Sequence, residues 1–343
     1  MPTASQLIKK GVVMNKKVLI SQAWQNENVP RLNEFIAQLE AKGCDVTLFP
    51  STKTMAETDL LEWLPGFYAH ICCRADWTAN VMNQLKDLKI IARLGTGFET
   101  VDIPAATQRG IVVTITPGAG AYPTAECAFA MLLSLSIRLH ENDRQMRAGV
   151  WSPRSGNSIY GKTLGIVGLG LIGKEMAKLV CGFNMKVLAH DLVRDDTFAK
   201  QHNIQYVSLP ELLKASDFVS LSLPYSKSTR HLIGEKEFAM MKDTACIINV
   251  SRGGILDEKA LYHALDQKII IAAGLDVFDT EQLPLDNPLR TLENVILTPH
   301  MAGSSKEGLD GIVGMATQSV IDLIEDRVPL GIKNPEVLSV SNG

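Results

Sequence analysis

Short apolar segments alternate with stretches of helical spacing along most of the chain. Val29–Lys42, for example, has the pattern of an amphipathic helix and lies between two apolar runs. Strands separated by helical segments predict right-handed crossover connections and a parallel sheet. In a first series, Ala79–Leu85 is predicted to be helical, and the predicted strands are Lys17–Ser21, Asp45–Phe49, His70–Cys73, Lys89–Arg93 and Ile111–Ile115.

A second series of the same kind begins at Thr163. Two separate series indicate an α/β protein with two lobes, each built on a parallel sheet. The helix predicted first in this series is Ile172–Cys181. The predicted strands are Leu164–Val167, Lys186–His190, Asp217–Leu221, Ala245–Asn249, Ala272–Leu275 and Val295–Leu297.

The segment between the two series contains one long apolar helix. Thr116–Gly120 combines Pro with Gly and is predicted to be a loop. Ala125–Leu139 is apolar on nearly every face, which predicts a helix buried at the junction of the lobes or in a subunit interface. The polar stretch Glu141–Gly149 and the loop Trp151–Tyr160 are then expected to lead into the second series.

The composition is that of a globular protein with a sizeable core. Of the 343 residues, 46% are hydrophobic and 21% charged, which excludes a collagen, a disordered chain and a disulfide scaffold. Lys and Arg number 34 against 37 Asp and Glu. The net charge of −3 predicts no general attraction to nucleic acid or to an anionic membrane, although a local basic pocket remains compatible with it.

The cysteines and the N-terminal segment favour a cytoplasmic location. Six cysteines are scattered without a Cys-x-x-Cys pair, so we expect thiols in a reducing compartment and no metal site. The N-terminus lacks the apolar core of a signal peptide, and the apolar run Ala128–Leu139 is too short to span a bilayer. Met14 is an alternative start, which would make residues 1–13 an extension.

A glycine-rich turn follows the first strand of the second series. Gly168, Gly170 and Gly173 form the pattern Gly-x-Gly-x-x-Gly between an apolar strand and a helix. In that context the first glycine permits a tight turn, the second lets the backbone approach a pyrophosphate, and the third allows close helix–strand packing. The N–H groups at the helix N-terminus then stabilise the phosphate charge. The context favours a dinucleotide site over a coincidental glycine-rich turn.

An acidic residue follows the next strand of the same series. Asp191 lies at its end, where a carboxylate accepts hydrogen bonds from the adenosine ribose hydroxyls and repels the 2′-phosphate of NADP. Arg194 lies three residues further on and would partly offset this repulsion. The acid at the strand end favours NAD as the cofactor.

Four further motifs follow one another along the chain: Gly161–Gly165, Asn249–Gly254, Gly274–Phe278 and Thr298–His300. In this order they make the chain resemble the D-isomer-specific 2-hydroxyacid dehydrogenases over nearly its whole length. The resemblance implies a homodimer with two lobes in each chain. Residues 1–117 plus 304–343 would form a flavodoxin-like substrate lobe, to which Ser304–Asp326 returns as a helix, and residues 118–303 a Rossmann NAD-binding lobe.

The resemblance places Arg252, Glu281 and His300 at the catalytic positions of enzymes that interconvert 2-hydroxy and 2-keto acids. An imidazole such as that of His300 exchanges a proton with the C2 oxygen near neutral pH. Glu281 would orient the ring and favour its protonated form, while Arg252 would hold the substrate carboxylate and polarise the C2 oxygen. Taken singly, each has a plainer explanation: a surface or packing histidine, a solvated glutamate, a turn arginine.

The resemblance also assigns residues to the cofactor. Asp276 is expected against the nicotinamide carboxamide. The other expected cofactor contacts are Leu171, Ile172, Leu223, Pro224, Val250, Ser251 and Gly303.

The substrate site is the part in which members of this family differ. The turn Gly95-Thr96-Gly97 follows a strand, and its N–H groups would make a nest for the substrate carboxylate. Arg74, Arg93 and Arg138 resemble the arginines that surround the phosphate in phosphoglycerate dehydrogenases, and three converging guanidinium groups recognise phosphate strongly. Solvated arginines or local ion pairs are the alternative explanation.

The predicted function is therefore an NAD-dependent dehydrogenase of a small anionic 2-hydroxy acid, with 3-phosphoglycerate and serine biosynthesis preferred. A glyoxylate, hydroxypyruvate or other 2-keto acid reductase is the alternative, because Tyr122 replaces a small polar residue and Ser222 stands where many members have His. An NAD-sensing binding protein that resembles the C-terminal-binding corepressors is the alternative from another class, since it also retains the Arg, Glu and His.

Overall fold

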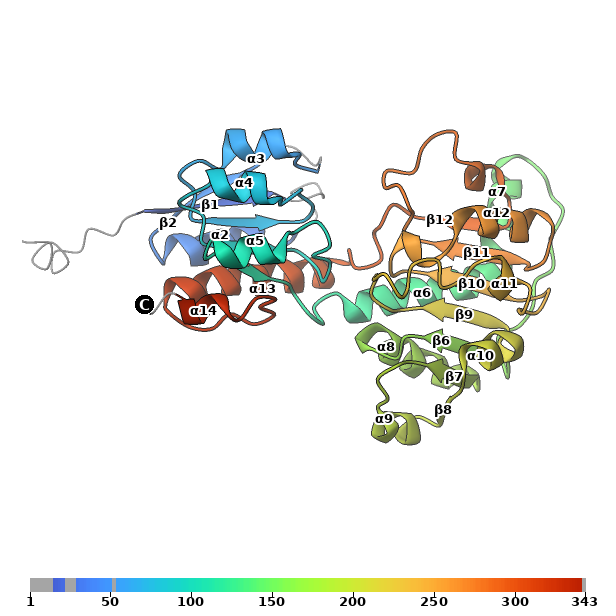
Figure 1. The fold of residues 1–343 in the computed structure, drawn as a ribbon. Coiled ribbons are helices and arrows are strands. Elements are labelled where there is room, and N and C mark those ends of the chain that lie inside the picture. Colours follow the sequence, from blue (N-terminus) through green and yellow to red (C-terminus); the bar gives the residue numbers. More distant parts are fainter. Residues whose placement is uncertain (1–14, 22–28, 51–53, 341–343) are drawn as a thin grey trace, which may run out of the picture. The chain divides into compact units, whose positions relative to one another are not determined.

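A computed structural model describes residues 15–21, 29–50 and 54–340, so the extension expected at residues 1–13 lies outside the described residues. The chain divides into two compact units (Figure 1). Unit 1 combines Met1–Gly120 with Lys306–Gly343, and unit 2 is Ala121–Ser305. No helix in the described part of the chain is both long and apolar enough to cross a membrane.

Unit 1 is built on a parallel sheet with the order β2-β1-β3-β4-β5, which is the flavodoxin order. The strands predicted for the first series are confirmed, because each is a short run of buried apolar residues. They are β1 (Lys16–Ser21), β2 (Cys44–Leu48), β3 (Ala69–Cys72), β4 (Ile90–Arg93) and β5 (Val112–Thr114).

Helices cover both faces of this sheet (Figure 1). One face packs against α2 (Leu32–Glu40) and α13 (Lys306–Ile324), and the other against α3 (Glu57–Trp63), α4 (Ala79–Gln84) and α5 (Ile103–Gln108). The helix predicted over Ser304–Asp326 is thus confirmed as α13, and it completes the core of unit 1 from the far end of the sequence. A short helix, α14 (Val337–Val340), follows it.

The segment after α13 pairs with the edge of the unit 1 sheet. The N–H of Ile115 donates to the carbonyl of Gly331 at 3.0 Å. Asn334 is fully buried; its Oδ1 accepts from the N–H of Val113 at 2.9 Å, and its Nδ2 donates to the carbonyl of Ile111 at 2.9 Å. One amide side chain therefore satisfies two backbone groups of the edge strand and fastens the end of the chain to it.

Unit 2 is built on a seven-stranded parallel sheet with the order β12-β11-β10-β9-β6-β7-β8. The order reverses between β6 and β9, as in the Rossmann fold, and the predicted fold class is confirmed. Its strands are β6 (Thr163–Val167), β7 (Lys186–His190), β8 (Ile204–Tyr206), β9 (Phe218–Leu221), β10 (Cys246–Asn249), β11 (Ala272–Leu275) and β12 (Val295–Leu297).

Two hydrophobic layers cover this sheet. One contains α6 (Ala121–Ser136), α8 (Leu171–Leu179) and α9 (Asp196–Gln201). The other contains α10 (Leu209–Ala215), α11 (Glu235–Phe238) and α12 (Glu258–Asp266). The buried side chains of α6 belong to the core of unit 2 itself, where Met131 and Leu135 lie against Gly274 of β11.

The polar stretch after α6 differs from the prediction. The helix predicted to run to Leu139 ends at Ser136, and a second helix, α7 (Leu139–Arg147), occupies the stretch expected to be a connection. Apolar periodicity does not reveal α7, because nearly all its side chains are polar. Charge explains it: Arg147 pairs with Asp143 one turn earlier at 2.8 Å, and two arginines in the last turn face the negative end of the helix dipole.

Candidate active site

The three glycines of the dinucleotide motif adopt the conformations that a phosphate-binding turn requires. Gly168 follows β6 with φ of 95°, and a Cβ there would lie 2.6 Å from the carbonyl oxygen of Ser222. Gly170 precedes α8, and the position of a Cβ there has no atom within 4 Å. A Cβ on Gly173 would collide with the carbonyl of Gly168. The backbone therefore turns tightly, stays open and packs closely at the places predicted.

Asp191 connects the end of β7 with this turn. One of its carboxylate oxygens accepts a hydrogen bond from the N–H of Leu169 at 2.7 Å, and the other from the N–H of Val193 at 2.9 Å. Arg194 is engaged elsewhere, because it pairs with Asp196 at 2.7 Å and lies 4.5 Å from the ring of Tyr206. An acid thus stands next to the glycine turn while the neighbouring cation is held in a local ion pair.

The residues present fit a bound dinucleotide. Leu171 and Ile172 begin α8, and the first N–H groups of a helix have no partner within it. Beside the turn, the Ser222 Oγ is buried and has no hydrogen-bond partner among the described residues. Leu223 and Pro224 come just after Ser222 at the end of β9, and Val250 and Ser251 follow β10. Because parallel strands end at one edge, these segments share the edge at which α/β sheets bind ligands.

His300 and Glu281 are brought together by two turns at this edge of unit 2. Glu281 lies in the segment after β11, and His300 lies just after β12 with φ of 52°. The Nδ1 of His300 lies 2.8 Å from both carboxylate oxygens of Glu281. The imidazole is 38% exposed and the carboxylate 17%, so the ring is oriented from one side while the rest of it remains accessible.

Asp276 fastens the turn that carries His300. It is fully buried at the end of β11 and accepts from the Thr298 hydroxyl at 2.6 Å and from the N–H groups of Met301 and Ala302 at 2.8 and 2.9 Å. Burial raises the pKa of Asp276, and these hydrogen bonds oppose that effect. Both of its oxygens are thus used within its own chain, and its expected contact with the nicotinamide carboxamide stays a prediction. Gly303 follows this turn, and a Cβ on it would lie 3.5 Å from the Oγ1 of Thr124.

Arg252 lies in the turn after β10. Its Nη1 donates to the carbonyl of Ser251 at 2.7 Å, and its own carbonyl accepts from the amide of Asn249 at 2.9 Å. A Cβ on the neighbouring Gly253 would collide with the backbone of Phe278. This close approach brings the turn of Arg252 against the start of the segment that carries Glu281.

In unit 1, the turn after β4 has two N–H groups without an acceptor among the described residues. The N–H of Gly95 donates to the Thr116 hydroxyl at 2.9 Å, whereas no described residue accepts from the N–H of Thr96 or Gly97. One of the three N–H groups expected in the anion nest is therefore already bonded, and the nest stays a prediction for Thr96 and Gly97. Thr116, which holds the turn, was not apparent from the sequence, because it lies 21 positions away and carries no motif.

Arg93 lies beneath this turn and is only 5% exposed. Its Nε donates to the carbonyl of Gly97 at 3.2 Å, and its Nη1 lies 3.8 Å from the Cys72 Sγ. Among the described residues no carboxylate forms an ion pair with it. Arg74 follows β3 at the same sheet edge and is partly buried.

Arg138 does not lie on the long helix as predicted, because that helix ends two residues earlier. It precedes α7 with φ of 56°, and its guanidinium meets both carboxylate oxygens of Glu141, at 2.9 and 2.6 Å. Arg154 contacts the same carboxylate at 2.7 Å. Burial is the largest single influence on the pKa of Glu141 and raises it, but the two arginines together hold that pKa below its ordinary value. For Arg138, the local ion pair is the explanation that the structure supports.

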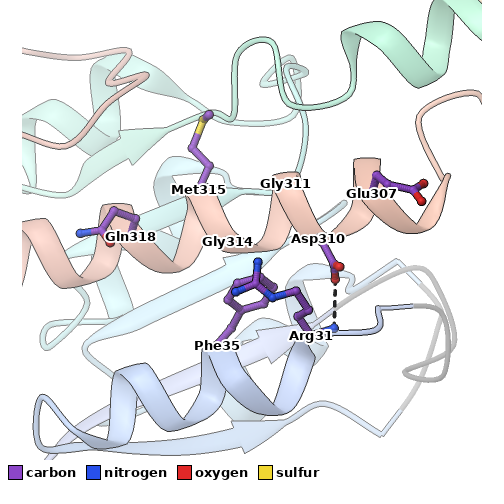
Figure 2. A pocket seen from close by; sticks show the side chains of 8 residues that line it. All are labelled: Arg31, Phe35, Glu307, Asp310, Gly311, Gly314, Met315 and Gln318. Carbon is purple, nitrogen blue, oxygen red and sulfur yellow. Dashed lines mark hydrogen bonds between the residues drawn. The ribbon is translucent and has the colours of Figure 1, made fainter.

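Figure 2 shows a hollow elsewhere in unit 1, between α2 and α13. The N–H of Arg31 donates to Asp310 there at 3.0 Å, and the Arg31 side chain lies over the ring of Phe35 and pairs with Glu34. Arg31 is thus held by neighbours on both sides of the hollow. None of the residues predicted to bind cofactor or substrate lines it.

Comparison with known proteins gives consistent results. Residues 129–302 match the family model of the D-isomer specific 2-hydroxyacid dehydrogenase, NAD binding domain. A glyoxylate reductase of Korarchaeum cryptofilum is 42% identical over 76% of this chain and 81% of its own length. A D-3-phosphoglycerate dehydrogenase of Archaeoglobus fulgidus is 36% identical over 90% of this chain and 57% of its own length.

Solved structures resemble the chain over nearly its whole length. A D-lactate dehydrogenase of Aquifex aeolicus, in complex with NAD and lactic acid, superposes with a TM-score of 0.80 at 28% identity. The match covers 92% of this chain and 99% of that one. The chain belongs to the D-isomer specific 2-hydroxyacid dehydrogenase family, and unit 2 contains its NAD-binding domain.

Proposed function

We propose that the protein is an NADH-dependent reductase of a small, unphosphorylated 2-keto acid of the glyoxylate and hydroxypyruvate class. The bound cofactor supplies the hydride that reduces C2. The pairing of Arg138 with Glu141 carries the choice of substrate, because it neutralises one of the three arginines that a phosphate would need.

The protonation chemistry rests on the pair in unit 2. Glu281 holds Nδ1 of His300 at 2.8 Å, which leaves Nε2 as the nitrogen that donates a proton to the C2 oxygen during reduction. Arg252 would hold the substrate carboxylate and polarise the C2 oxygen.

Unit 1 contributes recognition of an anion in this proposal. The N–H groups of Thr96 and Gly97 would donate hydrogen bonds to the carboxylate, as successive backbone N–H groups do in an anion nest. Arg93 would support them through the carbonyl of Gly97 and add positive charge from beneath. These groups are sufficient for a substrate with one carboxylate. Such a substrate does not need a second group of arginines to bind a phosphate.

A 3-phosphoglycerate dehydrogenase is the second candidate. Arg93 favours it, since a buried guanidinium without a described acidic partner suits an anion of higher charge. The relative in Archaeoglobus fulgidus has that activity in its name. The homodimer, the cytoplasmic location and a place in serine biosynthesis stay predictions.

A panel of 2-keto acids with NADH tests the proposal. We expect kcat/KM for glyoxylate or hydroxypyruvate to exceed that for 3-phosphohydroxypyruvate by at least about tenfold, or about 1.4 kcal/mol. A phosphate that enters the site without its guanidinium partners loses hydration that no protein group replaces. The reverse order would establish the second candidate. Binding of NADH without turnover of any member would instead favour the NAD-sensing binding protein.

A further inference from the structure

The loop that carries Glu281 is held at both ends by one carboxylate outside the predicted site. Glu258 is the first residue of α12 and is half-buried. Its Oε1 accepts from the N–H of Asp279 at 2.5 Å, two residues before Glu281. Its Oε2 accepts from the side-chain amide of Asn287 at 3.3 Å, six residues after it. Residues 279–287 are therefore closed into a loop across a single side chain.

The interior of the same loop is fixed by Arg290. Its Nε donates to the carbonyl of Pro284 at 2.8 Å, and its Nη2 donates to that of Leu283 at 2.7 Å. The N–H of Asn287 also donates to Pro284 at 3.2 Å. These bonds hold the far side of the loop, where Leu283 also packs against the hydrophobic core of unit 2. Glu258 adds the side-chain hydrogen bonds at the two ends of the loop.

The surroundings of Glu258 disfavour the charged form of its carboxylate. Burial raises the pKa of Glu258, and the Asp279 carboxylate raises it further, while the two hydrogen bonds from the loop oppose both effects. The helix does not need this side chain for its own start, because Asp257 already caps α12 by accepting from the N–H groups of Lys259 and Ala260. The described hydrogen bonds of the Glu258 side chain all go to the loop.

We propose that Glu258 is a positioning residue for catalysis, which acts by holding Glu281 where its carboxylate meets Nδ1 of His300. The inference rests on the proposed function, since that function assigns Glu281 and His300 their roles. A displacement of the loop by about 1 Å would break the 2.8 Å contact, because a hydrogen bond is lost beyond about 3.5 Å.

Four variants test this role: E258A, E258Q, E281Q and the double variant E258A/E281Q. For E258A we expect kcat to fall on the order of ten- to hundredfold, the usual weight of a group that orients a functional side chain. The Kd for NADH, measured by fluorescence, should stay within about twofold, since the glycine turn is carried by β6 and α8. E258Q retains an acceptor for the Asp279 N–H and should recover most of the lost turnover.

The double variant separates positioning from general damage. If Glu258 acts through Glu281, adding E258A to E281Q should lower kcat by less than about twofold, because residues that act as a unit are non-additive. Full additivity, or an equal loss of NADH affinity, would overturn the inference. E235A is the matched control, since Glu235 is an exposed glutamate at the first position of α11. Its kcat should equal that of the wild type.

The outcomes distinguish the two claims. Wild-type turnover in E281Q would overturn the proposed function and the positioning role with it. A large loss in E281Q with wild-type turnover in E258A would overturn the positioning role alone. Should E258A fail to fold, N287A removes the weaker of the two bonds of Glu258, together with the bond from the N–H of Leu289 to Asn287. It should lower kcat in the same direction by a smaller factor, again without effect in the E281Q background.

Discussion

Each unit places its candidate site residues at the carboxyl edge of its own parallel sheet. The two units differ in how deeply they bury a histidine. His70 of unit 1 lies within β3, fully buried, with its Nε2 2.6 Å from the Ser21 hydroxyl. Burial, with a smaller effect of Arg93, lowers the pKa of His70 to about 3. His300 of unit 2 lies in a turn, partly exposed, with a carboxylate on one nitrogen.

The arginines repeat this contrast. Arg93 of unit 1 is buried beneath a backbone turn and donates to a carbonyl and a thiol. Arg138 of unit 2 is neutralised by Glu141 in a local ion pair. Residue type alone therefore does not identify a proton donor or an anion site. What differs between these groups is their surroundings: the depth of burial and the partner that each side chain meets.

The largest expected effect is the loss of turnover when the imidazole of His300 is removed. For H300A we expect kcat to fall by roughly two to four decades, the usual contribution of a general acid or base. Steady-state oxidation of NADH with the best 2-keto acid of the panel measures it. H263A is the control, because His263 is exposed in the last turn of α12 and should leave kcat unchanged. Near-wild-type turnover in H300A would contradict the assignment.

Much of this architecture can be predicted from the sequence, because buried strands leave a strong signal. The predicted strands lie within one or two residues of the observed ones, since strands buried on both faces are apolar runs bounded by turn residues. Short helices such as α3 and α5, and the strand β8, leave no comparable pattern. Nor does α7, whose polar side chains are stabilised by ion pairs and not by a core.

Some residues of the candidate site can likewise be predicted from the sequence, and others cannot. Gly168, Gly170 and Gly173 are found from the sequence, because their spacing reports a local backbone geometry. Arg138 is misplaced, since a shift of the helix end by three residues moves it into an ion pair. Glu258 is 21 and 29 positions from the groups it binds, and only tertiary structure brings them together.

A second comparison concerns how each unit is closed. Unit 1 includes Asn334, which lies more than 200 positions from the backbone groups of Ile111 and Val113 that it bonds, whereas unit 2 is continuous in sequence. N334A leaves the N–H of Val113 and the carbonyl of Ile111 unsatisfied, and two such buried groups should cost about 2–4 kcal/mol of unfolding free energy. Hydrogen exchange should rise in β5 and stay unchanged in β6. Equal acceleration in both units would contradict this local role.

Lowering the pH should destabilise unit 1 before unit 2, and this is the smallest of the expected effects. The pKa of His70 in the folded protein, about 3, lies below the ordinary value of 6.5 that the unfolded chain recovers. The unfolded state therefore takes up a proton first, so the stability due to neutral His70 is complete well above pH 6.5 and falls as the pH drops toward 3.

Between pH 7 and pH 5 this linkage should remove about 2 kcal/mol from the stability of unit 1. The carboxylates of unit 2 with lowered pKa, such as Glu141 and Asp217, lose their contribution only when the pH falls below about 4.5. Urea unfolding followed by the fluorescence of the buried Trp77, whose ring lies 5.6 Å from that of His70, measures the effect. H70N is the control; it should lose about 2 kcal/mol less over this pH range, and an identical pH dependence would show that His70 is not the group that titrates.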